Sequence, residues 1–146
     1  MPTDALELES LVEDKARQPL VLIVDDDDAL TDVLSLRLKK VGFETRIASC
    51  GQSALSMARN QRPGVILLDV RLPDVDGLEL CQQLGDDPAT ADIPVIILSG
   101  LERPDIIRSA RAAGGCFFLR KPYDPNALLI LIRQAIEDAD NLWTDE

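Results

Sequence analysis

Five short segments that are predicted to form strands, separated by stretches with helical spacing, constrain the fold of this chain more than any other feature. They occupy residues 20–24, 44–48, 65–68, 95–98 and 116–120. Three of them are unbroken runs of Leu, Val and Ile, which is typical of strands covered on both faces. Because crossovers between parallel strands are right-handed, the alternation predicts an α/β three-layer sandwich with a five-stranded parallel sheet and five helices.

The expected helices fill the segments between the strands, over 30–41, 52–60, 78–84, 105–113 and 126–139. In the first, the apolar residues on one side are Leu30, Val33, Leu34, Leu38 and Val41. Gly42 follows that helix, at a position where helices often end with a residue in the left-handed conformation. We expect residues 1–19 to be an acidic N-terminal extension or linker, either a short helix over 3–16 or a solvated tail. Residues 20–140 then form the domain and 141–146 a C-terminal tail.

Composition excludes several classes of function. The chain has 15 basic and 26 acidic residues, a net charge of −11, which argues against direct binding of nucleic acid. It has no histidine, so catalysis through a Ser-His-Asp triad and a phosphohistidine on this chain are excluded. Cys50, Cys81 and Cys116 are too widely spaced for a zinc motif and are expected to be core hydrophobes. Without a long apolar run, we expect a cytoplasmic protein that does not contact the membrane.

Polar residues stand where four of the strands end. These are Asp25 and Asp26 after the first strand, Asp69 after the third, Ser99 after the fourth and Lys121 after the fifth. Each residue taken alone has a local explanation, as Asp28 has in capping the following helix. In a parallel sheet, however, the carboxyl ends of the strands open on one side, where α/β proteins bind ligands. Together the residues therefore indicate a functional site.

The residue types at these ends indicate phosphoryl chemistry. Converging carboxylates raise one another's pKa unless a cation neutralises them, and a set of oxygen ligands fits Mg²⁺. Lys121 adds a positive charge and Ser99 a hydroxyl donor, which together suit a tetrahedral anion. A carboxylate beside Mg²⁺ can attack phosphorus and form an aspartyl phosphate. Asp69 is the best candidate because it is the lone carboxylate at its strand end.

Four segments carry a resemblance to a known family: 21–27, 67–77, 95–100 and 121–123. In order and spacing they resemble the receiver domains of two-component response regulators, including those of chemotaxis, over about residues 20–140. The Asp-x-x-Leu-Pro-x-x-Asp-Gly pattern that begins at Asp69, followed by Lys-Pro-Tyr, is specific in combination. The resemblance implies a flavodoxin-like sheet with strand order 2-1-3-4-5. It also implies a signalling phosphoacceptor, not an enzyme, that assists its own phosphorylation and dephosphorylation.

The resemblance also implies roles for the site residues. Asp69 is the implied phosphoacceptor. Asp26, Asp69 and the backbone carbonyl of Arg71 are the implied Mg²⁺ ligands, with Asp25 acting mainly through water. If the first strand runs one residue longer, Asp26 and Asp27 become the acidic pair.

The remaining implied roles concern phosphoryl binding and switching. Ser99, in place of the commoner Thr, matches the residue that bonds a phosphoryl oxygen, and Lys121 matches the residue that pairs with the phosphoryl group. Gly100 matches a small residue that leaves room for it. Phe118, in place of the frequent Tyr, matches the aromatic switch residue. The bond from Lys121 to Pro122 is commonly cis in this family.

The partners follow from the missing histidine and from the last helix. A histidine kinase or a histidine phosphotransfer protein must supply the phosphoryl group. By resemblance, phosphorylation changes the face formed by the fourth helix, the fifth strand and the fifth helix. Residues 128–132 are apolar around more of the last helix than one buried stripe needs. They form either a homodimer or partner surface, or part of a deeply packed helix.

Two other functions compete with the receiver. A Mg²⁺-dependent phosphatase of the haloacid dehalogenase type also uses Asp, Ser and Lys at strand ends. Ala29, however, stands where its motif expects a hydroxyl, and that function leaves Asp69 unexplained. The second is a phosphate-independent protein-binding domain that keeps the fold, against which the retention of all the polar strand-end residues weighs. No Gly-x-Gly-x-x-Gly follows the first strand, which excludes a dinucleotide-binding domain.

Overall fold

The computed structural model describes residues 20–100 and 117–144, and within them a five-stranded parallel sheet. Its strands are β1 (Leu20–Val24), β2 (Glu44–Ala48), β3 (Val65–Asp69), β4 (Val95–Ser99) and β5 (Phe117–Arg120). They lie in the order β2-β1-β3-β4-β5, and every neighbouring pair is parallel. The fold class and strand order predicted from the sequence are confirmed.

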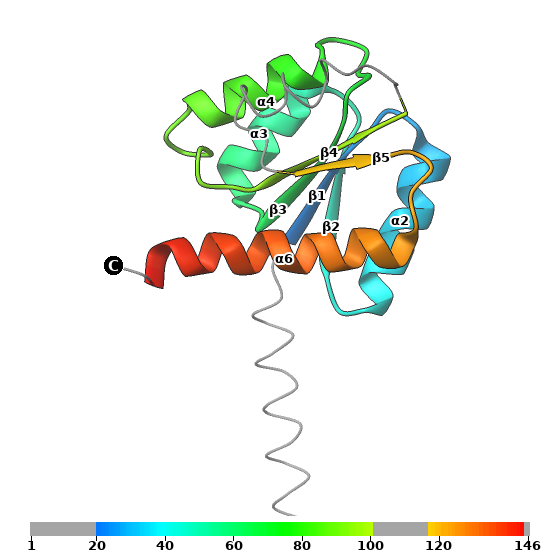
Figure 1. The fold of residues 1–146 in the computed structure, drawn as a ribbon. Coiled ribbons are helices and arrows are strands. Elements are labelled where there is room, and N and C mark those ends of the chain that lie inside the picture. Colours follow the sequence, from blue (N-terminus) through cyan, green and yellow to red (C-terminus); the bar gives the residue numbers. More distant parts are fainter. Residues whose placement is uncertain (1–19, 101–116, 145–146) are drawn as a thin grey trace, which may run out of the picture.

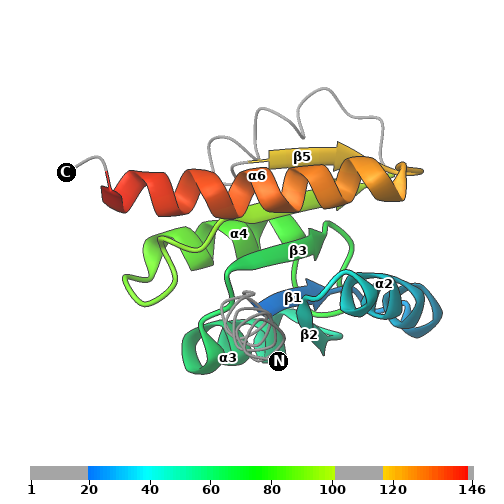
Figure 2. The same cartoon turned by 90° about the horizontal axis from the view of Figure 1, so that it is seen from below.

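Two layers of helices cover the two faces of the sheet. The helices are α2 (Asp28–Lys40), α3 (Gly51–Gln61), α4 (Gly77–Asp86) and α6 (Pro125–Thr144). Helices α3 and α4 lie on one side of the sheet and α2 and α6 on the other (Figures 1 and 2). On β1, Leu22 and Val24 belong to the core beneath α3 and α4, whereas Val21 and Ile23 belong to the core beneath α2 and α6. This is why the strand has no polar alternation.

The helix bounds agree with the sequence prediction to within a few residues. Helices α3 and α4 extend slightly beyond the predicted segments at both ends, and α6 continues from the expected 139 to Thr144. The predicted helix over 105–113 and the expectations for residues 1–19 lie outside the described residues. The part of the chain that the structure describes therefore has four helices, where five were predicted for the whole domain.

Helix α2 ends as predicted but buries a different set of residues. Gly42 has a φ of 101°, and its N–H donates to the Lys39 carbonyl at 3.0 Å. The N–H of Phe43 donates to the Leu38 carbonyl at 3.1 Å, which completes a Schellman motif. The buried side of α2 consists of Thr31, Leu34, Ser35 and Leu38, while Leu30, Val33 and Val41 are exposed. Two hydroxyls are accommodated in this interface because Ser35 hydrogen-bonds to Thr45 of β2, and Thr31 bonds to the Asp28 carbonyl.

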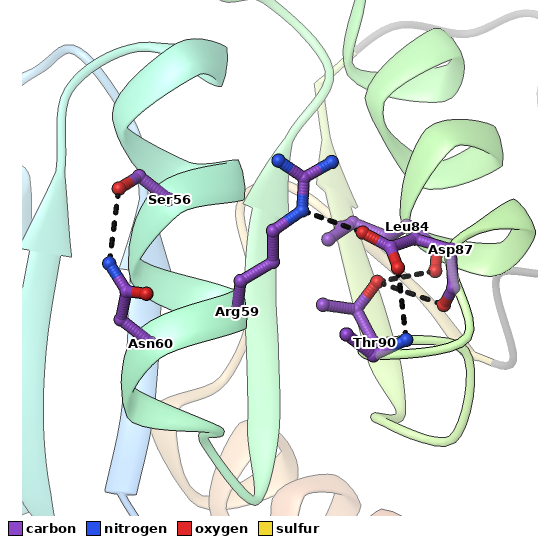
Figure 3. A network of polar contacts seen from close by, with 7 residues as sticks. Ser56, Arg59, Asn60, Leu84, Asp87 and Thr90 are labelled. Carbon is purple, nitrogen blue, oxygen red and sulfur yellow. Dashed lines mark hydrogen bonds and ion pairs between the residues drawn. The ribbon is translucent and has the colours of Figure 1, made fainter.

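Polar contacts connect α3 to the loop that follows α4 (Figure 3). The Arg59 guanidinium donates to the Asp87 carboxylate at 2.6 Å, and Thr90 donates its hydroxyl proton to the Leu84 carbonyl at 2.7 Å. The Asp87 carboxylate also accepts the N–H of Ala89 at 2.9 Å. These N–H and guanidinium contacts hold the pKa of Asp87 below its usual value.

Two further expectations concern the cysteines and the membrane. Cys81 is buried as predicted, but Cys50 is partly exposed at the start of α3 and is not a core residue. Cys116 lies outside the described residues. Over 20–100 and 117–144, no helix combines the length and the apolar character needed to cross a membrane.

Candidate functional site

Three carboxylates meet at the carboxyl edge of the sheet. Asp25 and Asp26 follow β1, and Asp69 is the last residue of the neighbouring strand β3. Each offers a carboxylate oxygen, and these oxygens lie within 4.8 Å of one another. Asp25 is buried, Asp69 is nearly buried with a side chain 13% exposed, and Asp26 is exposed. The structure thus brings together the three acidic residues that the sequence singled out.

The turn from β1 into α2 sets which aspartates face this cluster. The Asp25 carboxylate accepts the backbone N–H of Asp27 at 3.0 Å. The Asp27 carboxylate accepts the N–H of Leu30 at 3.2 Å and so caps the N-terminus of α2. The cap suggested for Asp28 is therefore wrong, because the helix begins at Asp28 and its cap is the preceding residue. Since β1 ends at Val24, Asp25 and Asp26 remain the acidic pair of the cluster.

Lys121 places its ammonium between two of the carboxylates. Its Nζ atom is 3.5 Å from Oδ2 of Asp25 and 3.6 Å from Oδ1 of Asp69. The backbone N–H of Lys121 donates to the Ser99 carbonyl at 2.8 Å, which fixes the residue beside the end of β4. The bond from Lys121 to Pro122 is cis, as the resemblance implied.

The electrostatics of the cluster favour a bound cation. Burial raises the pKa of Asp69, and the charges of Asp25 and Asp26 raise it further. The Lys121 ammonium and the backbone N–H of Arg71 act in the opposite direction. Because the net shift of the Asp69 pKa is upward, the protein's own groups do not fully offset the cost of charging this carboxylate. A hard divalent cation with oxygen ligands fits this set of donors.

A hollow of about 400 Å³ surrounds the carboxylates. It is lined by Asp25, Asp26, Asp27, Asp69, Arg71, Ser99, Gly100 and Lys121. Ser99 is buried at its wall, and a Cβ added to Gly100 would come no closer than 3.8 Å to the Cβ of Lys121. The hollow therefore contains the carboxylates, the lysine and the hydroxyl that were predicted to act together.

Phe118 and the last helix were predicted to take part in switching and in contacts with partners. Phe118 is partly buried and packs against the core beneath α3 and α4. On α6, Leu128 and Ile132 are buried whereas Ile130 is 69% exposed. The apolar run 128–132 thus contributes to the core and also leaves apolar surface outside. The proposed fourth helix of the switch face lies outside the described residues.

Sequence reasoning missed the residues that hold the loop after Asp69. The Asp74 carboxylate accepts the backbone N–H of Gly51 at 2.7 Å and that of Gln52 at 3.1 Å. At the other end of the loop, a Cβ on Gly77 would lie 2.6 Å from the Asp69 carbonyl oxygen. The motif that begins at Asp69 contains Asp74 and Gly77, but nothing in it signals that Asp74 binds the start of α3.

Comparisons with known proteins agree with this geometry. A family model described as the response regulator receiver domain matches residues 21–133. The chain is similar to the DNA-binding dual master transcriptional regulator RpaA of Synechocystis, at 35% identity over 85% of this chain and 52% of that protein. It is also similar to the response regulator PleD of Caulobacter vibrioides, at 39% identity over 77% of this chain and 25% of that protein. The chain thus spans about half or less of these relatives.

Solved structures have the same fold. A CheY-like response regulator receiver domain protein from Methanospirillum hungatei matches with a TM-score of 0.80 and 27% identity, over 85% of this chain and 98% of that one. The chemotaxis response regulator CheY4 of Vibrio cholerae matches with a TM-score of 0.75 and 28% identity, over 81% of this chain and 98% of that one. The flavodoxin-like, CheY-like fold implied by the sequence is therefore confirmed.

Proposed function

The chain belongs to the response regulator receiver family, and from this premise we propose that Asp69 accepts a phosphoryl group from the phosphohistidine of a partner protein. The main support for the proposal is that carboxylate oxygens of Asp25, Asp26 and Asp69 lie within 4.8 Å of one another. In the transfer, a carboxylate oxygen of Asp69 attacks phosphorus and the P–N bond to the donor imidazole breaks. The imidazole leaves with the bonding electron pair and takes up a proton.

Asp26, Asp69 and the backbone carbonyl of Arg71 would hold Mg²⁺, with Asp25 contacting it mainly through water. Bound Mg²⁺ supplies positive charge that offsets the charge on the transferring phosphoryl oxygens. The donor set supports this assignment, because it contains oxygen ligands and the pKa of Asp69 is raised by burial and by its acidic neighbours.

Lys121 and Ser99 would bind the phosphoryl group after transfer. The Lys121 ammonium is 3.6 Å from Oδ1 of Asp69 and can pair with the new phosphoryl oxygens. Ser99 lines the same hollow, and its hydroxyl would donate to another of these oxygens. We infer that their movement toward the phosphoryl group, followed by Phe118, changes the face that includes β5 and α6.

The partners follow from this chemistry. We infer that the phosphodonor is a histidine kinase or a histidine phosphotransfer protein, and that the exchange takes place in the cytoplasm. The face that includes β5 and α6, with Ile130 69% exposed, is the surface we assign to a homodimer or an output partner. With a net charge of −11, the chain as a whole would not contact nucleic acid directly.

Phosphorylation with a small donor tests the proposal. After incubation with acetyl phosphate and Mg²⁺, intact-mass spectrometry should show a single added phosphoryl group that is stable in acid and labile in base. Asp69→Asn should lose this group. Asp28→Asn is the matched control, because Asp28 is an exposed residue in the first turn of α2 that does not line the hollow, and it should keep the group.

A measurement of phosphate monoester turnover separates the receiver from the phosphatase, which the family match does not favour. A phosphatase would hydrolyse many equivalents of a phosphate monoester, and Asp25→Asn would abolish this turnover. A phosphate-independent binding domain would acquire no phosphoryl group under any of these conditions. Either result would contradict the proposal.

A further inference from the structure

The loop between β3 and α4, residues 70–76, is closed at its base by backbone contacts. The N–H of Gly77 donates to the Val70 carbonyl at 2.8 Å, and Arg71 and Asp76 form an isolated antiparallel bridge. A Cβ on Gly77 would lie 2.6 Å from the Cα of Val70, so no larger residue fits without moving the backbone. The base of the loop is thus tied to the end of β3, immediately after Asp69.

The tip of the loop is tied to a different element. Asp74 accepts the N–H groups of Gly51 and Gln52, which are 23 and 22 residues away in sequence. Within the described part of the chain, the side chain of Cys50, at the N-cap position of α3, makes no capping hydrogen bond. Asp74 therefore provides the carboxylate that satisfies the first N–H groups of α3, where an anion is also favoured by the helix dipole.

The fit between this loop and α3 is close. A Cβ on Gly51 would lie 2.3 Å from Cγ1 of Val75 and 3.4 Å from Oδ1 of Asp74. A glycine at this position lets the start of α3 approach the loop closely enough for both hydrogen bonds to Asp74. The N–H groups that Asp74 accepts also lower its pKa, so it is a carboxylate at neutral pH.

The same loop carries the backbone of Arg71 to the candidate metal site. The backbone N–H of Arg71 lowers the pKa of Asp69, and Arg71 lines the hollow. With its base tied to β3 and its tip to α3, the loop holds this peptide group in one place. Without the contact at the tip, the loop would lose its polar attachment to α3 and keep only the ties at its base and the packing of Leu72 and Val75 against the core.

We propose that Asp74 is a positioning residue for the Mg²⁺ and phosphoryl site, because by binding the start of α3 it fixes the loop that presents the Arg71 backbone beside Asp69. This inference rests on the proposed function. Since coupling between two sites is reciprocal, cation binding at Asp69 should in turn stabilise the hydrogen bonds from Gly51 and Gln52 to Asp74.

Mg²⁺ titration followed by calorimetry tests the proposal on the intact chain. Partners that orient metal ligands contribute 10–100-fold to affinity, and we expect Asp74→Ala to weaken Mg²⁺ binding by about tenfold. Asp74→Asn keeps one acceptor and should fall between Asp74→Ala and the wild type. Asp87→Ala is the matched control, because Asp87 also accepts one backbone N–H and one further donor but lies away from the hollow. It should bind Mg²⁺ as the wild type does.

Amide hydrogen exchange provides a second measurement. If Asp74 had a purely structural role, Mg²⁺ would not change this exchange. In the wild type, saturating Mg²⁺ should slow the exchange of the Gly51 and Gln52 amides. In Asp74→Ala their exchange should be fast and indifferent to Mg²⁺. If Asp74→Ala does not fold, Gly51→Ala tests the same contact from the other side and should also weaken Mg²⁺ binding, because its Cβ displaces Val75.

The outcomes are distinct. If Asp26→Asn abolishes Mg²⁺ binding while Asp74→Ala binds as the wild type does, the inference is overturned and the proposed function stands. If Asp87→Ala loses as much affinity as Asp74→Ala, or Mg²⁺ leaves the Gly51 and Gln52 amides unchanged in the wild type, the inference is likewise overturned. If the wild type binds no Mg²⁺, both proposals fail.

Discussion

The two helical layers differ in how their outer parts are held. On the side of α3 and α4, Arg59 pairs with Asp87 at 2.6 Å, and Arg62 pairs with Asp92 at 3.1 Å. Asp74 adds the contact between α3 and the loop after β3. These contacts join helices to loops, so this layer has polar attachments beyond its apolar core.

The outer surface of the layer of α2 and α6 is instead partly apolar. Val33 is 64% exposed, Leu36 is 61% exposed and Ile130 is 69% exposed. Two hollows of about 440 Å³ and 360 Å³ lie along α2, and the residues that line them extend to Tyr123 and to the start of α6. Apolar surface of this kind is typical of a face that meets other molecules.

Both layers are therefore built on a buried apolar core, but their outer surfaces differ in chemical character. Each has its own apolar core against the sheet. The layer of α3 and α4 holds the loop that follows the candidate phosphoacceptor, which requires fixed geometry. The layer of α2 and α6 leaves large apolar side chains exposed. Four measurements test whether the two layers differ in this way.

The largest expected effect concerns the two cores. Leu80 of α4 and Leu128 of α6 are both almost fully buried, at 0% and 1% exposure, on opposite faces of the sheet. Leu80→Ala and Leu128→Ala should each lower the free energy of unfolding by about 2–5 kcal/mol, because each leaves a cavity. Urea denaturation measures this loss. A loss well below 1 kcal/mol for either variant would show that its layer does not rest on a tightly packed core.

The next effect concerns the site itself, at the carboxyl edge of the sheet that the two layers cover. At a concentration 100 times its Kd, Mg²⁺ should raise the free energy of unfolding by about 2.7 kcal/mol, because it binds only the folded chain. The gain should disappear in Asp26→Asn and persist in Asp76→Asn, which alters the cap of α4. Thermal unfolding with and without Mg²⁺ measures it, and an equal gain in all three proteins would argue against this site.

A smaller effect concerns pH and the polar attachments of α3. The N–H of Ala89 and the Arg59 guanidinium lower the folded-state pKa of Asp87. Its stabilisation is therefore present above the unfolded-state pKa of about 3.9, and it is lost as the pH falls through the folded-state value. The wild type should be more stable than Asp87→Asn at pH 7, and their melting temperatures should converge toward pH 2. A difference that stays constant with pH would contradict the assigned charge interaction.

The smallest effect is expected on the exposed face of α2. Leu36→Lys places a charge where the side chain is already 61% exposed, and it should change the free energy of unfolding by about 0.5 kcal/mol or less. The neighbouring variant Leu38→Lys is the control. Leu38 is fully buried, so this variant should unfold the protein or greatly destabilise it. Similar losses in both variants, measured by urea denaturation, would show that the face of α2 is covered in solution.

The positions of the strands and the acidic residues at their ends followed from the sequence alone. Unbroken apolar runs specify buried parallel strands, and parallel strands bring their carboxyl ends to one edge whatever the details of packing. For this reason the grouping of Asp25, Asp26, Asp69 and Lys121 was predictable from their places at the strand ends.

The contacts that join distant segments of the chain depend on the tertiary structure. Helical spacing put Leu30, Val33 and Val41 on the apolar side of α2, but the angle at which the helix meets the sheet buries Thr31 and Ser35 instead. The hydrogen bond from Gly51 to Asp74 spans 23 residues and depends on how closely α3 approaches the loop after β3. Periodicity and spacing describe neighbours along the chain, whereas these contacts depend on how the helices pack against the sheet.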